Sequence, residues 1–198
     1  MYIKYIMLFM NAKFVIAVFM SYAISSFANW NVTTAVQYAD ATWDCAGESP
    51  PCENCSNRVP SGSGQSPYGC APYVAHILSA GGVNTGCGKC GSSGCYSNVE
   101  YNGKYYDLNV VGSKDKNCGG LCLMDYLEAK GWVEVPYNDI DAGVVCAVDG
   151  GSNFEDPWGH IVFGVSKGKL DAHNVARYHQ SIDVYAGHVR QCLKNKNV

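Results

Sequence analysis

The sequence lacks any block of basic residues. Lysine and arginine number 14 against 17 aspartates and glutamates, and the formal net charge is −3. Proteins that bind nucleic acid or an anionic membrane surface cluster lysine and arginine on one face, so we expect neither partner. Charged residues make up only 16% of the chain, whereas it holds 22 glycines and 14 tyrosines. This composition points to a loop-rich, turn-rich domain.

A second long apolar run is also missing. One run covers residues 5–27, interrupted by Asn11 and Lys13, and no later stretch has the length of a membrane span. The small residues Ser26 and Ala28 match a signal-peptidase site. We therefore expect residues 1–28 to be a cleaved signal peptide and residues 29–198 to be one secreted, monomeric domain without stable membrane insertion. An uncleaved signal anchor is the alternative.

The chain does not have an even number of cysteines, because it has 11. In an exported protein these form a disulfide framework, and an odd count leaves at least one thiol. Five bridges and one thiol, at Cys70, is the simplest division. A zinc site is the alternative, because Cys52 and Cys55, and also Cys87 and Cys90, have the spacing of a zinc knuckle. Exported thiols tend to oxidise, so we expect disulfides and no metal.

The stretch that begins at Cys70 predicts a short helix with a reactive cysteine at its start. Pro72 suits a first helical turn, and Gly81 suits a helix end. Apolar residues recur at the spacing of a buried helical stripe, at Val74, Ile77 and Leu78. Amide groups and the helix dipole at a helix N-terminus favour a thiolate. Cys70 is therefore the candidate nucleophile.

The remaining elements indicate an α+β fold, with helices first and antiparallel strands later. A helix is expected within residues 32–43, with Asn31 or Thr33 as its N-cap, and another over residues 122–130. Asn102-Gly103 predicts a hairpin turn between two aromatic runs. Strands are expected at residues 132–135, 144–148, 160–165 and 170–174, with a polar loop over residues 149–157.

A cysteine nucleophile needs a base, and the chain has five histidines. His76 lies six positions after Cys70 on the same predicted helix, so its side chain points away from the cysteine. We interpret it as a helix-face histidine with a structural role. His160 stands at the start of an apolar strand, where the rim of a sheet places functional groups. It is the candidate base, with a plain edge histidine as the alternative.

The residue that orients His160 depends on the turn at Lys167-Gly168. A two-residue loop makes Ser166 face Lys169 and puts His173 diagonally next to His160 on one face. A loop longer by one residue shifts the register, so that Asn174 shares the face of His160 instead. Asp171 shares the face of His173 but lies farther along the strand. We favour His173.

Four stretches resemble NlpC-type and CHAP-type peptidoglycan amidases and endopeptidases. Residues 68–82, Tyr-Gly-Cys-Ala-Pro-Tyr-Val-Ala-His-Ile-Leu-Ser-Ala-Gly-Gly, resemble the family's cysteine helix. Asp-Ala-Gly-Val-Val at 141–145 and Trp-Gly-His-Ile-Val-Phe-Gly-Val at 158–165 are similar to a strand start and to the histidine strand. Leu-Asp-Ala-His-Asn-Val-Ala-Arg-Tyr-His at 170–179 resembles the third-residue strand of the putative-amidase and secreted amidase-effector branch. The usual Asp is replaced by Gly69 before the cysteine and by Val144 at the strand start.

The resemblance implies a papain-like α+β fold, in which N-terminal helices pack on a C-terminal antiparallel sheet with disulfide-stapled loops. It implies Cys70 as nucleophile, His160 as base and His173 as the orienting residue, with no cofactor. The expected activity is cleavage of amide bonds in peptidoglycan stem peptides, with an antibacterial or wall-lytic role. The alternatives are a disulfide-rich binding module without catalysis, or a protein-directed cysteine peptidase or acyltransferase.

Overall fold

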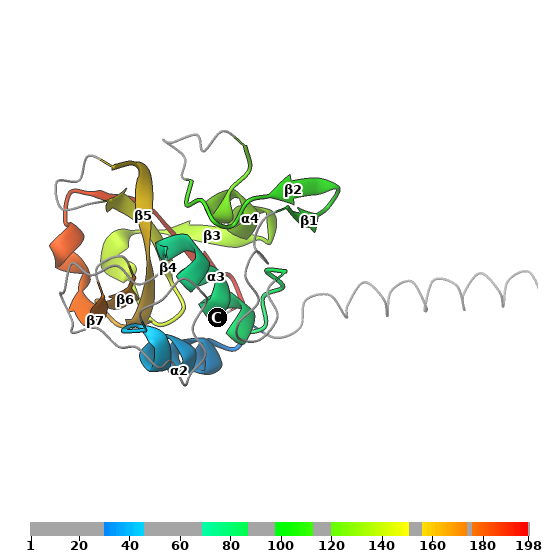
Figure 1. Ribbon diagram of the computed structural model, residues 1–198. Coiled ribbons are helices and arrows are strands. Elements are labelled where there is room, and N and C mark those ends of the chain that lie inside the picture. Colours follow the sequence, from blue (N-terminus) through cyan, green and yellow to red (C-terminus); the bar gives the residue numbers. More distant parts are fainter. Residues whose placement is uncertain are drawn as a thin grey trace, which may run out of the picture.

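The computed structural model describes residues 30–45, 69–86, 98–112, 120–150, 156–173 and 176–197. The expected signal peptide and the four cysteines of the zinc alternative lie outside these residues. Within the described part of the chain, three α-helices accompany a sheet of six antiparallel strands and a separate hairpin, so the predicted α+β class is confirmed (Figure 1). None of the helices in these residues is long and apolar enough to cross a membrane.

The described elements follow one another as the sequence order predicts, with two helices before the strands. The helices are α2 (Val32–Thr42), α3 (Cys70–Ala80) and α4 (Leu123–Ala129). Two short 3-10 helices are η2 (Tyr137–Asp139) and η3 (Ile182–Tyr185). The strands are β1 (Val99–Tyr101), β2 (Lys104–Tyr106), β3 (Trp132–Val135), β4 (Val145–Gly150), β5 (Asp156–Ser166), β6 (Lys169–Ala172), β7 (Arg177–Ser181) and β8 (Val189–Asn195).

The large sheet has the strand order β3-β8-β4-β5-β6-β7. Strands β4 to β7 form an antiparallel meander, and β8 returns to the other side of β4, where β3 joins it at the edge. Cys146 and Cys192 stand directly opposite each other on β4 and β8 and form a disulfide. The bridge therefore fixes the contact between the meander and the strand that closes it.

Each helix begins or ends where a local signal predicts. The Asn31 side chain accepts a hydrogen bond from the amide of Thr34 at 3.0 Å, so Asn31 is the N-cap of α2. Helix α3 begins at Cys70, buries the predicted stripe, and ends where the amide of Gly81 donates to Ile77. At α4, the Asp125 carboxylate accepts the amide of Cys122 at 2.8 Å, as in a capping box.

The predicted hairpin is confirmed as β1 and β2, which form a two-stranded sheet of their own. Tyr101 pairs with Lys104, and the two residues between them, Asn102 and Gly103, both have positive φ angles, of 51° and 72°. Two consecutive positive φ angles define a type I′ turn, which explains the Asn-Gly sequence. Figure 1 shows this hairpin at the opposite end of the molecule from β7.

Two apolar cores lie on the two faces of the large sheet. Helices α2 and α3 pack against β5, and their side of the sheet contributes alternate residues such as Ile161 and Phe163 (Figure 1). The intervening Val162 belongs to the other core, which η3 covers with Ile182 and Tyr185. We call these the helix-side core and the η3-side core. The period of two along β5 is the alternation of a strand buried on both faces.

Strand β5 differs from the prediction, because it begins at Asp156 rather than at His160. The polar loop expected over residues 149–157 is therefore shorter. His160 pairs with Val148 inside the strand, but the register shifts immediately before it, between Val148 and Gly150 of β4. Gly159 has a φ of 72°, a backbone conformation that glycine adopts without strain. The strand is thus interrupted at Gly159, and His160 is the first residue after the interruption.

Candidate functional site

Cys70 is the first residue of α3, and it is buried. Of the five cysteines among the described residues, Cys70 alone stays outside a disulfide, because Cys45 and Cys122 are disulfide-bonded and Cys146 pairs with Cys192. The thiol at Cys70 is the one that the odd cysteine count predicts. Its position at a helix start places it beside backbone amides that have no acceptor within the helix. This arrangement favours a thiolate over a thiol.

His160 lies on β5 with its side chain buried. Its ring centroid is 5.9 Å from that of Tyr185, at an interplanar angle of 43°. Because Tyr185 belongs to the η3-side core, His160 approaches the site from that side of the sheet. The sequence predicts His160 as a rim residue, and the structure gives it an aromatic neighbour that no local sequence signal indicated.

Tyr185 is close in space to both candidate catalytic residues. Burial raises the pKa of its hydroxyl, the Arg177 guanidinium lowers it, and negative charge at Cys70 raises it. Arg177 donates from Nε to the Tyr185 hydroxyl at 3.1 Å. Tyr185 is therefore within electrostatic range of Cys70 and in ring contact with His160. It is the residue of this region that sequence reasoning missed.

His173 lies at the end of β6 and is buried against the helices. One ring nitrogen, Nε2, is 2.8 Å from the carbonyl oxygen of Thr42 in α2, and the ring stacks on Tyr73 of α3 at 3.9 Å. The described contacts of His173 thus join the sheet to the helix side. Its role in orienting His160 stays a prediction.

The register between β5 and β6 starts as predicted and then changes. Ser166 faces Lys169, as the two-residue loop requires, but farther along the pairs are Gly164 with Leu170 and Phe163 with Asp171. The expectation of one unbroken register is therefore wrong. At Gly164 and Phe163, each residue of β5 pairs one position earlier on β6 than expected. The shifted register is the one on which the Asn174 alternative depends, and Asn174 itself lies outside the described residues.

His76 has the structural role that its helix position predicts. Its side chain is buried and lies parallel to the ring of Tyr38 in α2, with centroids 6.4 Å apart. Burial lowers the pKa of His76 to about 4, because the charged imidazolium loses its water. A histidine that is neutral at physiological pH between two helices is part of the core and not of the site.

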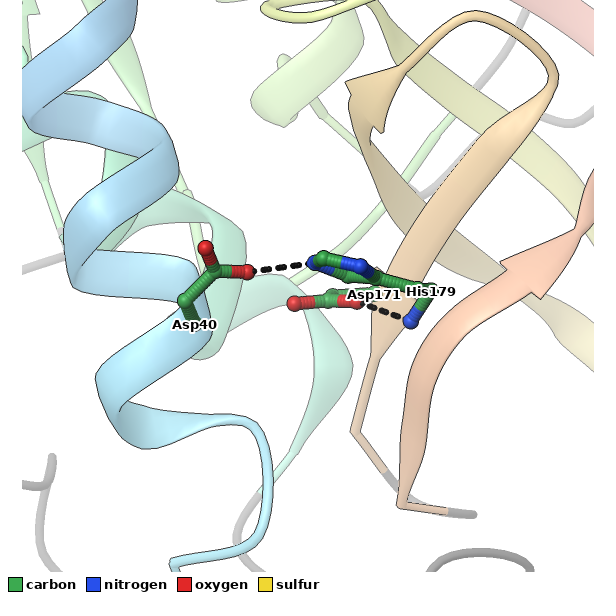
Figure 2. Close-up of side chains that lie close together, drawn as sticks. All are labelled: Asp40, Asp171 and His179. Carbon is green, nitrogen blue, oxygen red and sulfur yellow. Dashed lines mark hydrogen bonds and ion pairs between the residues drawn. The ribbon is translucent and has the colours of Figure 1, made fainter.

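A second cluster of ionisable groups joins α2 to β6 and β7. Asp40, Asp171 and His179 place one potential ligand atom each within 4.8 Å of one another (Figure 2). His179 Nε2 is 2.7 Å from a carboxylate oxygen of Asp40, and the backbone amide of His179 donates to Asp171 at 2.6 Å. Sequence reasoning missed this cluster, because its members come together only through the packing of α2 on the sheet.

Comparisons with known proteins do not assign this site. No family model matches the chain, and no curated protein and no solved structure matches it. The resemblance of the cysteine helix and the three later stretches to wall hydrolases therefore stays an expectation. Any function has to be argued from the residues themselves.

Proposed function

We propose that this chain is a secreted cysteine hydrolase with a papain-like fold that cleaves amide bonds in the stem peptides of peptidoglycan. The observation that carries the proposal is the position of Cys70. It keeps a thiol at a helix start, while the other four described cysteines are in disulfides. The same thiol is within electrostatic range of Tyr185, whose ring is 5.9 Å from His160.

In the first half of the reaction, the Cys70 thiolate attacks the carbonyl carbon of the amide. The imidazolium of His160 gives its proton to the nitrogen as the carbon–nitrogen bond breaks, so that an amine leaves and a thioester remains. In the second half, neutral His160 takes a proton from water. The resulting hydroxide attacks the thioester, the carbon–sulfur bond breaks, and the thiolate and the imidazolium are restored, with the acid as the second product.

Charge develops on the carbonyl oxygen in both halves. The first amides of α3 have no acceptors within the helix, and they point toward the end of the helix at which Cys70 lies. These amides are the donors that we assign to the developing oxyanion. Pro72 occupies the first turn without removing a helical hydrogen bond, because an amide at that position has no acceptor in the helix. No cofactor is required by these steps.

Peptidoglycan is the proposed substrate because four stretches resemble wall hydrolases, at residues 68–82, 141–145, 158–165 and 170–179. The third catalytic residue is His173 in this proposal, with Asn174 and Asp171 as the alternatives. The contact of His173 with the Thr42 carbonyl gives it a fixed ring position at the helix side. A triad partner acts by holding the base in one orientation, so its loss lowers the rate without removing the thiol.

The test is release of soluble muropeptides from purified cell wall, measured by chromatography and mass spectrometry. We expect Cys70→Ala and His160→Gln to lower the rate at least about 10³-fold, because nucleophile and base act as a unit. His188→Gln is the matched control, since His188 is an exposed histidine outside the site. Equal release by the wild type and Cys70→Ala would refute the nucleophile assignment. Binding to cell wall without products would favour the non-catalytic module instead.

Alkylation of the thiol tests the ion pair separately from the substrate. The rate of reaction with iodoacetamide follows the thiolate fraction, so wild-type Cys70 should react at a lower pH than Cys70 in His160→Gln. Cleavage of casein but not of cell wall would identify a protein-directed peptidase on the same residues. His173→Ala and Asn174→Ala, compared in the muropeptide assay, decide which of them orients the base.

A further inference from the structure

The cluster of Asp40, Asp171 and His179 contains one group that is unusual for a protein interior. Asp171 is fully buried. One of its oxygens accepts the amide of His179, but among the described residues Oδ2 has no hydrogen-bond donor. Figure 2 shows the free end of this carboxylate directed toward the carboxylate of Asp40. A buried oxygen without a donor is costly, and a second carboxylate facing it adds repulsion.

Two facing carboxylates need a positive group between them, which is either a proton or a metal ion. Burial raises the pKa of Asp171 to about 7. The hydrogen bond from the His179 amide and the charge on the His179 ring lower this pKa, whereas Asp40 raises it. A cation bound beside the unpartnered Oδ2 of Asp171, within reach of Asp40 and His179, would supply this positive group. The other described histidine–aspartate pair has only one carboxylate, because Asp149 lies beside both His188 and the guanidinium of Arg190.

We propose that Asp40, Asp171 and His179 bind a divalent transition-metal ion, for which Zn²⁺ is the best match. An imidazole nitrogen with two carboxylate oxygens is a ligand set typical of zinc and its neighbours. Calcium and magnesium prefer six or more oxygen ligands and seldom use imidazole. Three protein ligands leave a fourth position for water, as in zinc sites that are open to solvent.

The distances are within reach of such a site after small movements. Tetrahedral zinc with bonds of about 2.0–2.1 Å separates its ligand atoms by about 3.3–3.4 Å. The contact between His179 Nε2 and Asp40, now 2.7 Å, has to lengthen by about 0.6 Å. The other separations, at most 4.8 Å, have to shorten by at most about 1.5 Å. The side chains of His179 and Asp40 are 41% and 35% exposed, so the ion and these two ligands can move into place.

Binding exchanges protons for the metal. The ion takes the place of the proton that His179 shares with Asp40 and of any proton on Asp171, and these protons pass to solvent. The ligands belong to α2, β6 and β7, so the ion would link the helix to the edge of the sheet. We therefore expect zinc to stabilise the fold in addition to occupying the site.

The experiment is a zinc titration of the full chain carrying Cys70→Ser, which removes the thiol as a competing ligand. Isothermal titration calorimetry should give one site, and the melting temperature should rise by about 5 °C or more at a hundredfold excess over Kd. Asp40→Asn and His179→Gln should each weaken binding at least about tenfold. Both side chains are partly exposed, so these variants keep the metal-free melting temperature close to that of the parent.

His188→Gln is the matched control, because it alters the other described histidine–aspartate pair and should leave the affinity unchanged. Asp171→Asn tests the buried ligand, with its circular-dichroism spectrum as the check on folding. The proposal is overturned if the parent binds no zinc at micromolar concentrations. It is equally overturned if binding persists undiminished in both Asp40→Asn and His179→Gln, since the ion then lies elsewhere on the chain.

Discussion

The two sides of the large sheet are closed in different ways. On the helix side, α2 and α3 cover a core that also buries ionisable groups, namely His76, Asp171 and His173. On the η3 side, the core consists mainly of aliphatic residues, with buried His160 beside Tyr185, and a disulfide between β4 and β8 runs through it. One side thus depends on polar contacts between helix and sheet, and the other on a covalent bond and aliphatic packing.

The candidate site draws on both sides. Cys70 comes from α3 and belongs to the helix-side core, whereas His160 contacts Tyr185 of the η3-side core. The interruption at Gly159 lies next to His160 and changes the register of β5 there. The proposed nucleophile belongs to one core and the proposed base contacts the other. Both residues therefore keep their positions only while both cores stay intact. Stability on either side is therefore a condition for the proposed activity.

The largest stability effect is expected from the covalent side. The Cys146–Cys192 bridge spans 46 residues of sequence, and in the chain-entropy model a loop of this length stabilises a fold by about 4 kcal/mol. Replacing both cysteines with alanine should lower the free energy of unfolding by about this amount. Urea unfolding followed by tryptophan fluorescence measures it.

A matched variant separates the bond from the packing around it. Val162→Ala removes two methyl groups from the same η3-side core and should cost about 2 kcal/mol. The double alanine variant should also raise the dependence of the unfolding free energy on urea, because its unfolded chain exposes more surface. Val162→Ala should leave that dependence unchanged. A double variant with the stability of Val162→Ala and an unaltered urea dependence would contradict the cross-link argument.

Local signals in the sequence are enough to predict the helix that carries Cys70 and the hairpin away from the site. Gly69, Pro72 and Gly81 define the helix after Cys70, and Asn102-Gly103 defines the hairpin. These features depend on a few neighbouring residues, so the sequence contains their cause. The assignment of Cys70 as a thiol needed only the odd cysteine count and its place at the helix start.

The arrangement of side chains across the sheet could not be predicted in the same way. The register shift between Ser166 and Gly164 reverses the face of the later residues of β6 relative to His160, and it lies where Gly164 packs closely against residues before β4. The Tyr185 contact and the cluster of Asp40, Asp171 and His179 likewise depend on how separate elements pack. Sequence periodicity fixes which face a residue shares with its own strand, but not which residues of other elements meet it.

The next prediction concerns the ionisable groups of the helix side. Burial lowers the pKa of His76 to about 4 in the folded protein, below its value of 6.5 in an unfolded chain. Its contribution to stability is therefore complete above about pH 6.5 and is lost as the pH falls toward 4, because the unfolded chain takes up the proton first. The loss should reach about 3 kcal/mol. Urea unfolding at pH 7, 5 and 4 measures it.

Comparison with His76→Gln isolates this contribution from the other titrating groups. The variant has no proton to gain at this position, so the difference in unfolding free energy between wild type and variant should shrink by about 3 kcal/mol from pH 7 to 4. His188→Gln is the control, because the His188 side chain is 38% exposed and lies 3.8 Å from Asp149, so that this contact contributes at most about 1 kcal/mol. A constant difference between wild type and His76→Gln would mean that His76 takes up its proton at the same pH in the folded protein as in the unfolded chain.

The smallest expected effect is at Gly164, which lies at the register shift between β5 and β6. A Cβ at this position would overlap the carbonyl oxygen of Asp141 and lie 3.1 Å from a side-chain carbon of Ile140. Gly164 also donates its amide to Val144 at 2.7 Å and accepts from Gly143 at 2.9 Å, so its backbone has little room to move. Gly164→Ala should cost about 2 kcal/mol through overpacking. Gly120→Ala is the matched control, because a Cβ there meets nothing within 4 Å.

This variant also tests how the register reaches the site. If Gly164 sets the one-residue shift between β5 and β6, the strain of Gly164→Ala acts on the pairs of Gly164 with Leu170 and of Phe163 with Asp171. Hydrogen exchange of the amides on β5 and β6 should then accelerate, while exchange at the disulfide between β4 and β8 stays slow. Uniform acceleration over both regions would show that the sheet loses stability as one unit. In that case the β5–β6 pair and the disulfide-linked β4–β8 pair would differ in their contacts but not in their local stability.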